Sequence, residues 1–142
     1  MSNSFIADET ILYQLYDIYR RTAPKFESCT GISQTRLKLL HELYEVEEIS
    51  QRELQKRVNI DHAAVTRHLK QLEEKRMVIR RKNPEDQRFT YVQLSDEGRL
   101  RIIQYREEKQ KFISDVLNGF KEEERVQLLD MLTRIQNNIE KI

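Results

Sequence analysis

The chain has 142 residues, of which 38% are hydrophobic and 35% charged, and its formal net charge is +1. This length suits one domain, or one functional lobe with an association segment attached. Three glycines and two prolines are too few for a disordered or turn-rich all-β protein. The lone Cys29 excludes a disulfide framework within the chain.

Charge is distributed unevenly along the chain. Residues 50–91 contain 11 Lys and Arg against 6 Asp and Glu, whereas residues 1–49 and 92–142 carry net charges of −3 and −1. A basic block of this kind is the electrostatic footprint expected of a segment that binds phosphate. We find no apolar run approaching the roughly 20 residues needed to span a bilayer and no signal-peptide pattern, so we expect a cytoplasmic protein without a membrane partner.

Helical spacing of apolar residues dominates the first third of the chain. Ile11, Leu15 and Ile18 indicate an amphipathic helix over about residues 8–26. A break follows at residues 29–32. Ser33 is then a plausible N-cap for a second helix, which carries Leu37, Leu40, Leu43 and Tyr44.

The centre of the chain predicts two short helices in close succession. Ser50 and Glu53 form a Ser-x-x-Glu capping-box pattern at the start of the first. Asn59 and Ile60 form the turn, and Asp61 caps the second helix. In that helix three apolar residues fall at i, i+4 and i+7, so we expect them to point inward: Val65, Leu69 and Leu72.

Beyond residue 76 the periodicity changes. Residues 77–81 and 89–94 are rich in β-branched and aromatic side chains, and turn-forming residues separate them, which predicts a β-hairpin. Ser95 then caps a long helix whose middle, residues 106–111, is entirely polar. The last helix has an apolar seam with 4-3-4-3 spacing: Leu128, Leu132, Ile135, Ile139 and Ile142.

Helix, short turn, helix and hairpin is the order of a winged helix-turn-helix. The predicted fold is therefore mainly α with a small β-hairpin wing, a winged helix-turn-helix with flanking dimerisation helices. Residues 1–32 and 99–142 would supply dimerisation helices, and residues 33–98 the DNA-binding domain. The apolar seam of the last helix is long for one chain to cover, which favours a homodimer.

The second helix of the pair should present its polar face to double-stranded DNA. Arg67 can contact guanine, Thr66 a phosphate or base edge, and Ala63 a thymine methyl. The hairpin suits the minor groove. The complete predicted DNA-binding set is Arg52, Lys56, His62, Ala63, Thr66, Arg67, Lys70, Lys82, Asp86 and Arg88.

Two other interpretations of these features remain open. A basic helix face is often only a solvated surface, and a small winged domain can be a protein-interaction module without specific DNA binding. DNA binding is favoured because several features occur together: a pair of capped helices, an apolar stripe that points inward, a cationic outward face and a basic hairpin. We find no phosphate-binding glycine loop, zinc-hydrolase motif or nucleophile context, so we expect no enzyme and no cofactor.

Residues 86–98, DQRFTYVQLSDEG, resemble the wing signature of the MarR family of transcriptional regulators. Residues 64–67 and 72–73 resemble the recognition helix of that family. The resemblance implies a homodimer with one winged domain on each half-site of a pseudo-palindromic operator. It also implies that Asp86 orients Arg88 by an ion pair. Most members repress transcription and are released from DNA by a small-molecule inducer or by thiol oxidation.

The sequence departs from the family pattern at two places. The family usually has glycine where the recognition helix ends, and Arg76 stands there. A left-handed conformation at a non-glycine residue costs about 1 kcal/mol. The oxidation-sensing branch places its cysteine in the opening turns of the first helix, whereas Cys29 lies near the end of that helix. Cys29 is thus a redox candidate that competes with a simple packing role.

Aromatic and histidine residues provide the remaining candidates. Four tyrosines could line a ligand pocket between the first and second helices, although aromatics at helical spacing are more often core or dimer interface: Tyr13, Tyr16, Tyr19 and Tyr44. His41, His62 and His68 match no metal-ligand motif, so we expect no metal.

Overall fold

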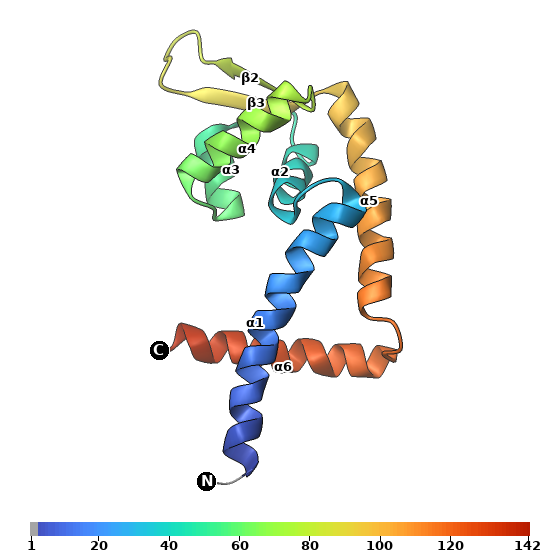
Figure 1. Ribbon diagram of the computed structural model, residues 1–142. Coiled ribbons are helices and arrows are strands. Elements are labelled where there is room, and N and C mark those ends of the chain that lie inside the picture. The colour runs from blue at the N-terminus through green and yellow to red at the C-terminus, as the bar shows by residue number, and fades with distance from the viewer. Residues whose placement is uncertain (1–2) are drawn as a thin grey trace. The chain divides into compact units, whose positions relative to one another are not determined.

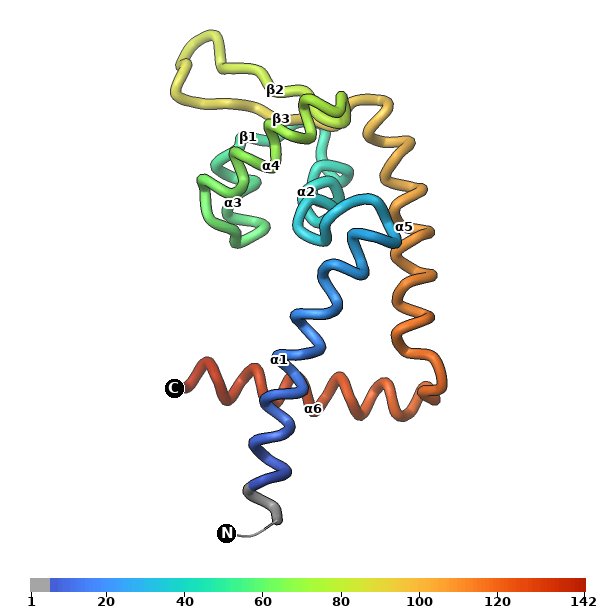
Figure 2. Tube along the Cα trace, in the orientation of Figure 1, coloured from blue at the N-terminus to red at the C-terminus, as the bar shows by residue number. Residues whose placement is uncertain are grey.

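The computed structural model describes residues 3–142, with side chains from residue 6 onward. The chain divides into two compact units, Met1–Lys109 and Gln110–Ile142. Figures 1 and 2 show the course of the chain. The helices are α1 (Asn3–Thr30), α2 (Gln34–Tyr44), α3 (Gln51–Val58), α4 (His62–Glu74), α5 (Asp96–Val116) and α6 (Glu122–Glu140), and the strands are β1 (Ile49–Ser50), β2 (Val78–Lys82) and β3 (Thr90–Leu94).

Side-chain caps begin α2, α3 and α4 at the residues that the sequence predicted. Ser33 Oγ accepts from the backbone N–H of Arg36 at 3.2 Å at the start of α2. Ser50 Oγ accepts from the N–H of Glu53 at 3.1 Å, and a carboxylate oxygen of Asp61 accepts from the N–H of Ala64 at 3.2 Å. These bonds satisfy N–H groups that have no partner within the helix.

The core of the first unit lies between α2, α3, α4 and the sheet. Val65, Leu69 and Leu72, which we expected to point inward, are at most 1% exposed. Apolar residues of α2 and α3, of the sheet and of the segment just before β2 also belong to this core: Leu37, Leu39, Leu40, Leu43, Leu54, Val58, Met77, Val78 and Val92. The side of α4 opposite this buried stripe is exposed.

The wing is a three-stranded antiparallel sheet in the order β1-β3-β2. The predicted hairpin is present, with Val78 opposite Leu94 and Lys82 opposite Thr90. The sequence analysis missed β1, in which Ile49 pairs with Val92. Two residues are too few to show an alternating pattern, and only the pairing with β3 defines this strand.

The exit of α4 is held by the start of α5. Arg76 has φ 62°, so the non-glycine residue at this position does adopt the left-handed conformation. Ser95 Oγ donates to the carbonyl of Arg76 at 2.6 Å and accepts from the N–H of Gly98 at 2.9 Å. The N–H of Ser95 donates to the carbonyl of Met77 at 3.0 Å. These bonds stabilise a left-handed backbone conformation that is unfavourable for a non-glycine residue such as arginine.

Helix α1 is longer than predicted. It begins at Asn3 and continues past residue 26 to Thr30, after which Gly31, with φ 81°, terminates it. Its last turns are anchored by Phe26, which is 3% exposed. The predicted apolar face earlier in the helix is mostly open to solvent in the single chain, with Ile11 48% and Ile18 60% exposed.

The second unit consists of the end of α5 and α6. Arg125 donates to the carbonyls of Leu117 and Phe120, which fixes the turn between these helices. Of the predicted seam, Leu128, Leu132 and Ile135 are half-buried, whereas Ile139 is 62% and Ile142 fully exposed. Apolar surface remains uncovered on α6.

Candidate nucleic-acid interface

The outward face of α4 carries the predicted DNA-facing residues. His62, Ala63, Thr66, Arg67 and Lys70 are all exposed. They occupy this face because the buried stripe of α4 takes up the opposite side of the helix. This face carries the cationic side chains of Arg67 and Lys70. Near the start of the helix the small side chain of Ala63 leaves room for close approach to base edges in a major groove.

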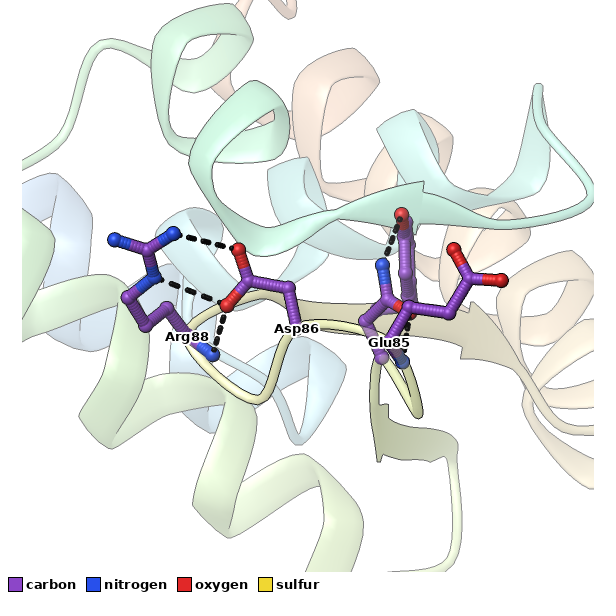
Figure 3. A network of polar contacts seen from close by, with 5 residues as sticks. Glu85, Asp86 and Arg88 are labelled. Carbon is purple, nitrogen blue, oxygen red and sulfur yellow. Dashed lines mark hydrogen bonds and ion pairs between the residues drawn. The ribbon is translucent and has the colours of Figure 1, made fainter.

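The wing presents Arg88 in a fixed orientation. Nε and Nη2 of Arg88 donate to Oδ1 and Oδ2 of Asp86 at 3.0 and 2.9 Å, and the N–H of Arg88 donates to Oδ1 at 3.1 Å (Figure 3). The Arg88 side chain is 87% exposed. The hydrogen bonds from Arg88 hold the pKa of Asp86 below its usual value. The geometry is the one that the family resemblance implied for Asp86.

The wing loop is also braced from within. Asn83 Oδ1 accepts from the N–H of Glu85 at 2.9 Å, and Asn83 Nδ2 donates to the hydroxyl of Tyr91 at 3.4 Å. Lys82, the last residue of β2, is exposed. The tip therefore has a defined backbone, with Lys82 at the end of β2 and Arg88 in the loop that leads into β3.

A polar cleft joins the wing to the start of α3 and α4. Its lining comes from three segments far apart in the sequence: Ser50, Gln51, Arg52, His62, Arg88, Phe89 and Thr90. The guanidinium of Arg52 lies 5.6 Å from the centre of the Phe89 ring. Arg52 belongs to the DNA-binding set predicted from sequence, and the structure adds a cation–π contact with Phe89 at the base of the wing.

Two bidentate ion pairs connect the sheet to its surroundings. Arg81 donates to both carboxylate oxygens of Glu48 at 2.9 and 2.6 Å, and its guanidinium lies 4.9 Å from the centre of the Tyr91 ring. Arg80 donates to both oxygens of Glu73 at 3.3 and 3.1 Å, linking β2 to α4. Sequence reasoning missed both pairs, because their partners are 33 and 7 residues apart and follow no periodicity.

Comparison with known proteins identifies this arrangement. Residues 32–90 match the model of the MarR family. The chain is 55% identical over 140 residues to the uncharacterized HTH-type transcriptional regulator YdgJ of Bacillus subtilis, an alignment covering 98% of this chain and 85% of that protein. The chain belongs to the MarR family. It is a DNA-binding transcriptional regulator and not an enzyme.

Solved structures agree with this fold. A mutant of E. coli MarR complexed with operator DNA matches with a TM-score of 0.76 at 22% identity, covering 94% of this chain and 99% of that one. A structure of Bordetella bronchiseptica BpsR, concerned with regulation of DNA binding by 6-hydroxynicotinic acid, matches with a TM-score of 0.76 at 19% identity, covering 89% and 98%. At these sequence identities the comparison with solved structures supports a shared fold only.

In this MarR-family chain the four predicted pocket tyrosines do not come together. Tyr13 and Tyr16 line a shallow open cleft on α1 with Gln14, Asp17 and Arg20. Tyr19 is 76% exposed. Tyr44 lies elsewhere, with the guanidinium of Arg106 4.5 Å and that of Arg99 5.5 Å from its ring centre.

The polar middle of α5 contacts α2. Arg106 Nε donates to Nδ1 of His41 at 3.2 Å, so α5 is tied to α2 by a hydrogen bond as well as by the stack on Tyr44. Burial, followed by the charges of Arg106 and Lys109, lowers the pKa of His41. His41 is half-buried on α2.

The remaining candidates of this MarR-family chain are simpler. Cys29 is exposed in the last turn of α1. Within residues 3–142 no group of three or more His, Cys, Asp and Glu is arranged to hold a metal ion. None of the helices the structure describes is both long and apolar enough to span a bilayer.

Proposed function

We propose that this regulator binds a pseudo-palindromic operator as a homodimer and represses transcription from the bacterial chromosome in the cytoplasm. The observation that supports this proposal is that α4 and the wing, the two elements expected to contact DNA, line the same cleft. His62, at the start of α4, and Arg88, on the wing, both line it. One winged domain can therefore contact the major groove with α4 and the adjacent minor groove with Arg88.

Phosphate contacts should supply much of the affinity in this proposal. Arg52, Lys56, Lys70 and Lys82 are exposed and lie on three different elements around α4 and the wing. Cations in such positions fix the register of a protein on the duplex without identifying bases. Sequence recognition would come from Arg67, Thr66 and the wing.

The proposed homodimer rests on apolar surface that the single chain leaves open. Ile11, Leu12 and Ile18 of α1 and Val126 and Leu129 of α6 are each at least 48% exposed. Exposed apolar residues in these numbers mark an association surface. Two-fold symmetry would place the half-sites about one helical turn, roughly 34–36 Å, apart.

Release by a small ligand is a further part of the proposal. The fold is shared with BpsR, whose DNA binding is regulated by 6-hydroxynicotinic acid. The cleft beside Tyr13 and Tyr16 is a candidate contact region for such an inducer. Titrating aromatic acids into a preformed protein–operator complex tests this point, since an inducer lowers the bound fraction and an indifferent compound leaves it unchanged.

The decisive experiment is selection from a random duplex library at two salt concentrations. We expect enrichment of an inverted repeat, and we expect its affinity to fall as salt rises because counterions are released on binding. Weak salt-sensitive binding without enrichment would contradict a specific operator. The absence of binding even at low salt would favour a protein-interaction module.

A further inference from the structure

The hydroxyl group of Thr66 is already engaged inside the winged domain. Its Oγ1 donates to the carbonyl of His62 at 3.0 Å, one turn earlier in α4. The same oxygen accepts from Nε2 of Gln51 at 2.7 Å. A hydroxyl has one proton to donate and two lone pairs. Thr66 therefore has no proton left for a DNA acceptor, such as a phosphate or the guanine edge.

Gln51 holds this arrangement from a neighbouring helix. It is the first residue of α3 and is only 9% exposed, one of two polar residues among the buried set of the described chain. A buried amide that has found a partner is costly to move, because an unpaired polar group would be left behind. The bond to Gln51 thus fixes which way the exposed side chain of Thr66 is turned.

Because both hydrogen bonds of Thr66 Oγ1 are made within the chain, the Cγ2 methyl is the group of this exposed side chain that is left for contact with DNA. Ala63 lies three residues earlier, on the same helix face, and is also exposed. The methyl groups of Ala63 and Thr66 would together offer a small apolar contact on a helix face that otherwise carries the polar side chains of His62 and Arg67. In the major groove the C5-methyl of thymine is the base group that such a spot contacts best.

We propose that Thr66 recognises thymine through its methyl group, and that Gln51 is the positioning residue that sets this chemistry. The inference rests on the proposed operator binding and specifies what the α4 face selects. Thymine should be required at one position in each half-site. The requirement concerns the base methyl and not a hydrogen bond to the hydroxyl.

The test uses the selected operator with each thymine replaced in turn by deoxyuridine, which removes only the methyl group. For the wild-type protein one replacement per half-site should weaken binding about four-fold, the worth of one buried methyl. Thr66→Val keeps the methyl and should keep this sensitivity. Thr66→Ser keeps the hydroxyl and should lose it at that position.

Gln51 has a matched control in the same helix. The side-chain amide of Gln55 also donates a hydrogen bond, but its acceptor is the carbonyl of Ile60, at 3.2 Å, and not Thr66. We expect Gln51→Leu to reduce the deoxyuridine sensitivity at the Thr66 position, and Gln55→Leu to leave it at the wild-type value. Unfolding midpoints of both variants identify any loss that comes from stability alone.

The outcomes separate this inference from the proposed function. Failure to enrich any operator overturns the proposed function and the inference with it. An enriched operator that is indifferent to every deoxyuridine overturns the inference alone. It is likewise overturned if Thr66→Ser keeps the sensitivity and Thr66→Val abolishes binding, since the hydroxyl would then be the recognising group.

Discussion

The α-carbon of Gly98 packs directly against the backbone carbonyl of Met77. A Cβ added at Gly98 would overlap the carbonyl oxygen of Met77 and lie 3.2 Å from Cδ2 of Leu94. Gly98 is buried in the first turn of α5, and Met77 starts the segment leading into β2. Gly98, the last residue of the wing signature, is thus required because two backbone segments approach closely there. One joins α4 to β2, and the other is the first turn of α5.

Gly98→Ala should therefore destabilise the folded chain by about 3 kcal/mol, because backbone atoms on the other side cannot rotate away. Denaturant midpoints provide the measurement. Gly31→Ala is a matched control, since no atom lies within 4 Å of a Cβ there and only the positive φ of 81° opposes alanine. It should cost about 1 kcal/mol. Equal midpoints for the two variants would contradict the close-approach explanation.

The ion pair in the wing leads to a second prediction. Asp86→Asn removes the charge that orients Arg88, so operator affinity should fall by roughly two- to five-fold, in line with an exposed pair. Arg88→Ala should weaken binding further, because it removes the group that we propose enters the minor groove. Binding measured by anisotropy distinguishes the two. If Asp86→Asn tightened binding, Asp86 would act as a repulsive charge toward DNA and not as a positioning residue.

Arg67 should discriminate one base pair. Arg67→Ala is expected to cost about 1–3 kcal/mol on the cognate operator and to relax the preference at that position. The measurement is repeated library selection with the variant. A uniform loss of affinity on all sequences would show that Arg67 contacts only phosphate. Lys70→Ala, one turn further along α4, is the comparison expected to give that uniform loss.

Charged residues in the seam of α6 should prevent association. Leu132→Glu combined with Ile135→Glu is expected to yield monomers by sedimentation and to abolish specific binding, because the proposed interface would bury unpaired charges. Gln136→Glu adds charge at an exposed position of the same helix and serves as control. Circular dichroism verifies that the helices persist. A folded monomer with full operator affinity would contradict the dimeric architecture.

Two histidines should make stability depend on pH. Burial, followed by neighbouring cations, lowers the pKa of His41 and of His68 below the ordinary value of 6.5. The unfolded chain therefore takes up protons first as the pH falls below about 6.5, and the free energy of unfolding decreases. His41→Gln with His68→Gln should reduce the difference in denaturant midpoint between pH 7.5 and pH 5.5. The exposed His62→Gln is the control, and an unchanged difference in the double variant would refute the assignment.

Local patterns determined the elements and the orientation of α4. Ser33, Ser50 and Asp61 predicted helix starts correctly because a cap involves residues only three apart. The spacing of Val65, Leu69 and Leu72 identified the buried stripe, and hence the outward face with Arg67, since helix geometry alone relates them. The wing signature, by family resemblance, also supplied the pairing of Asp86 with Arg88, two residues apart.

Contacts between distant segments were decided only by the tertiary structure. The strand β1 exists because Ile49 meets Val92, and the pairing of Glu48 with Arg81 spans 33 residues. The same holds for the bond from Gln51 to Thr66, which engages the hydroxyl that the sequence predicted to be free for DNA and underlies our proposal that Thr66 contacts thymine through its methyl group. No periodicity encodes such contacts, because they depend on how α3, α4 and the sheet pack together. The sequence alone thus determined which residues share the outward face of α4 that we propose meets DNA, and packing decided which hydrogen bonds those residues already make within the chain.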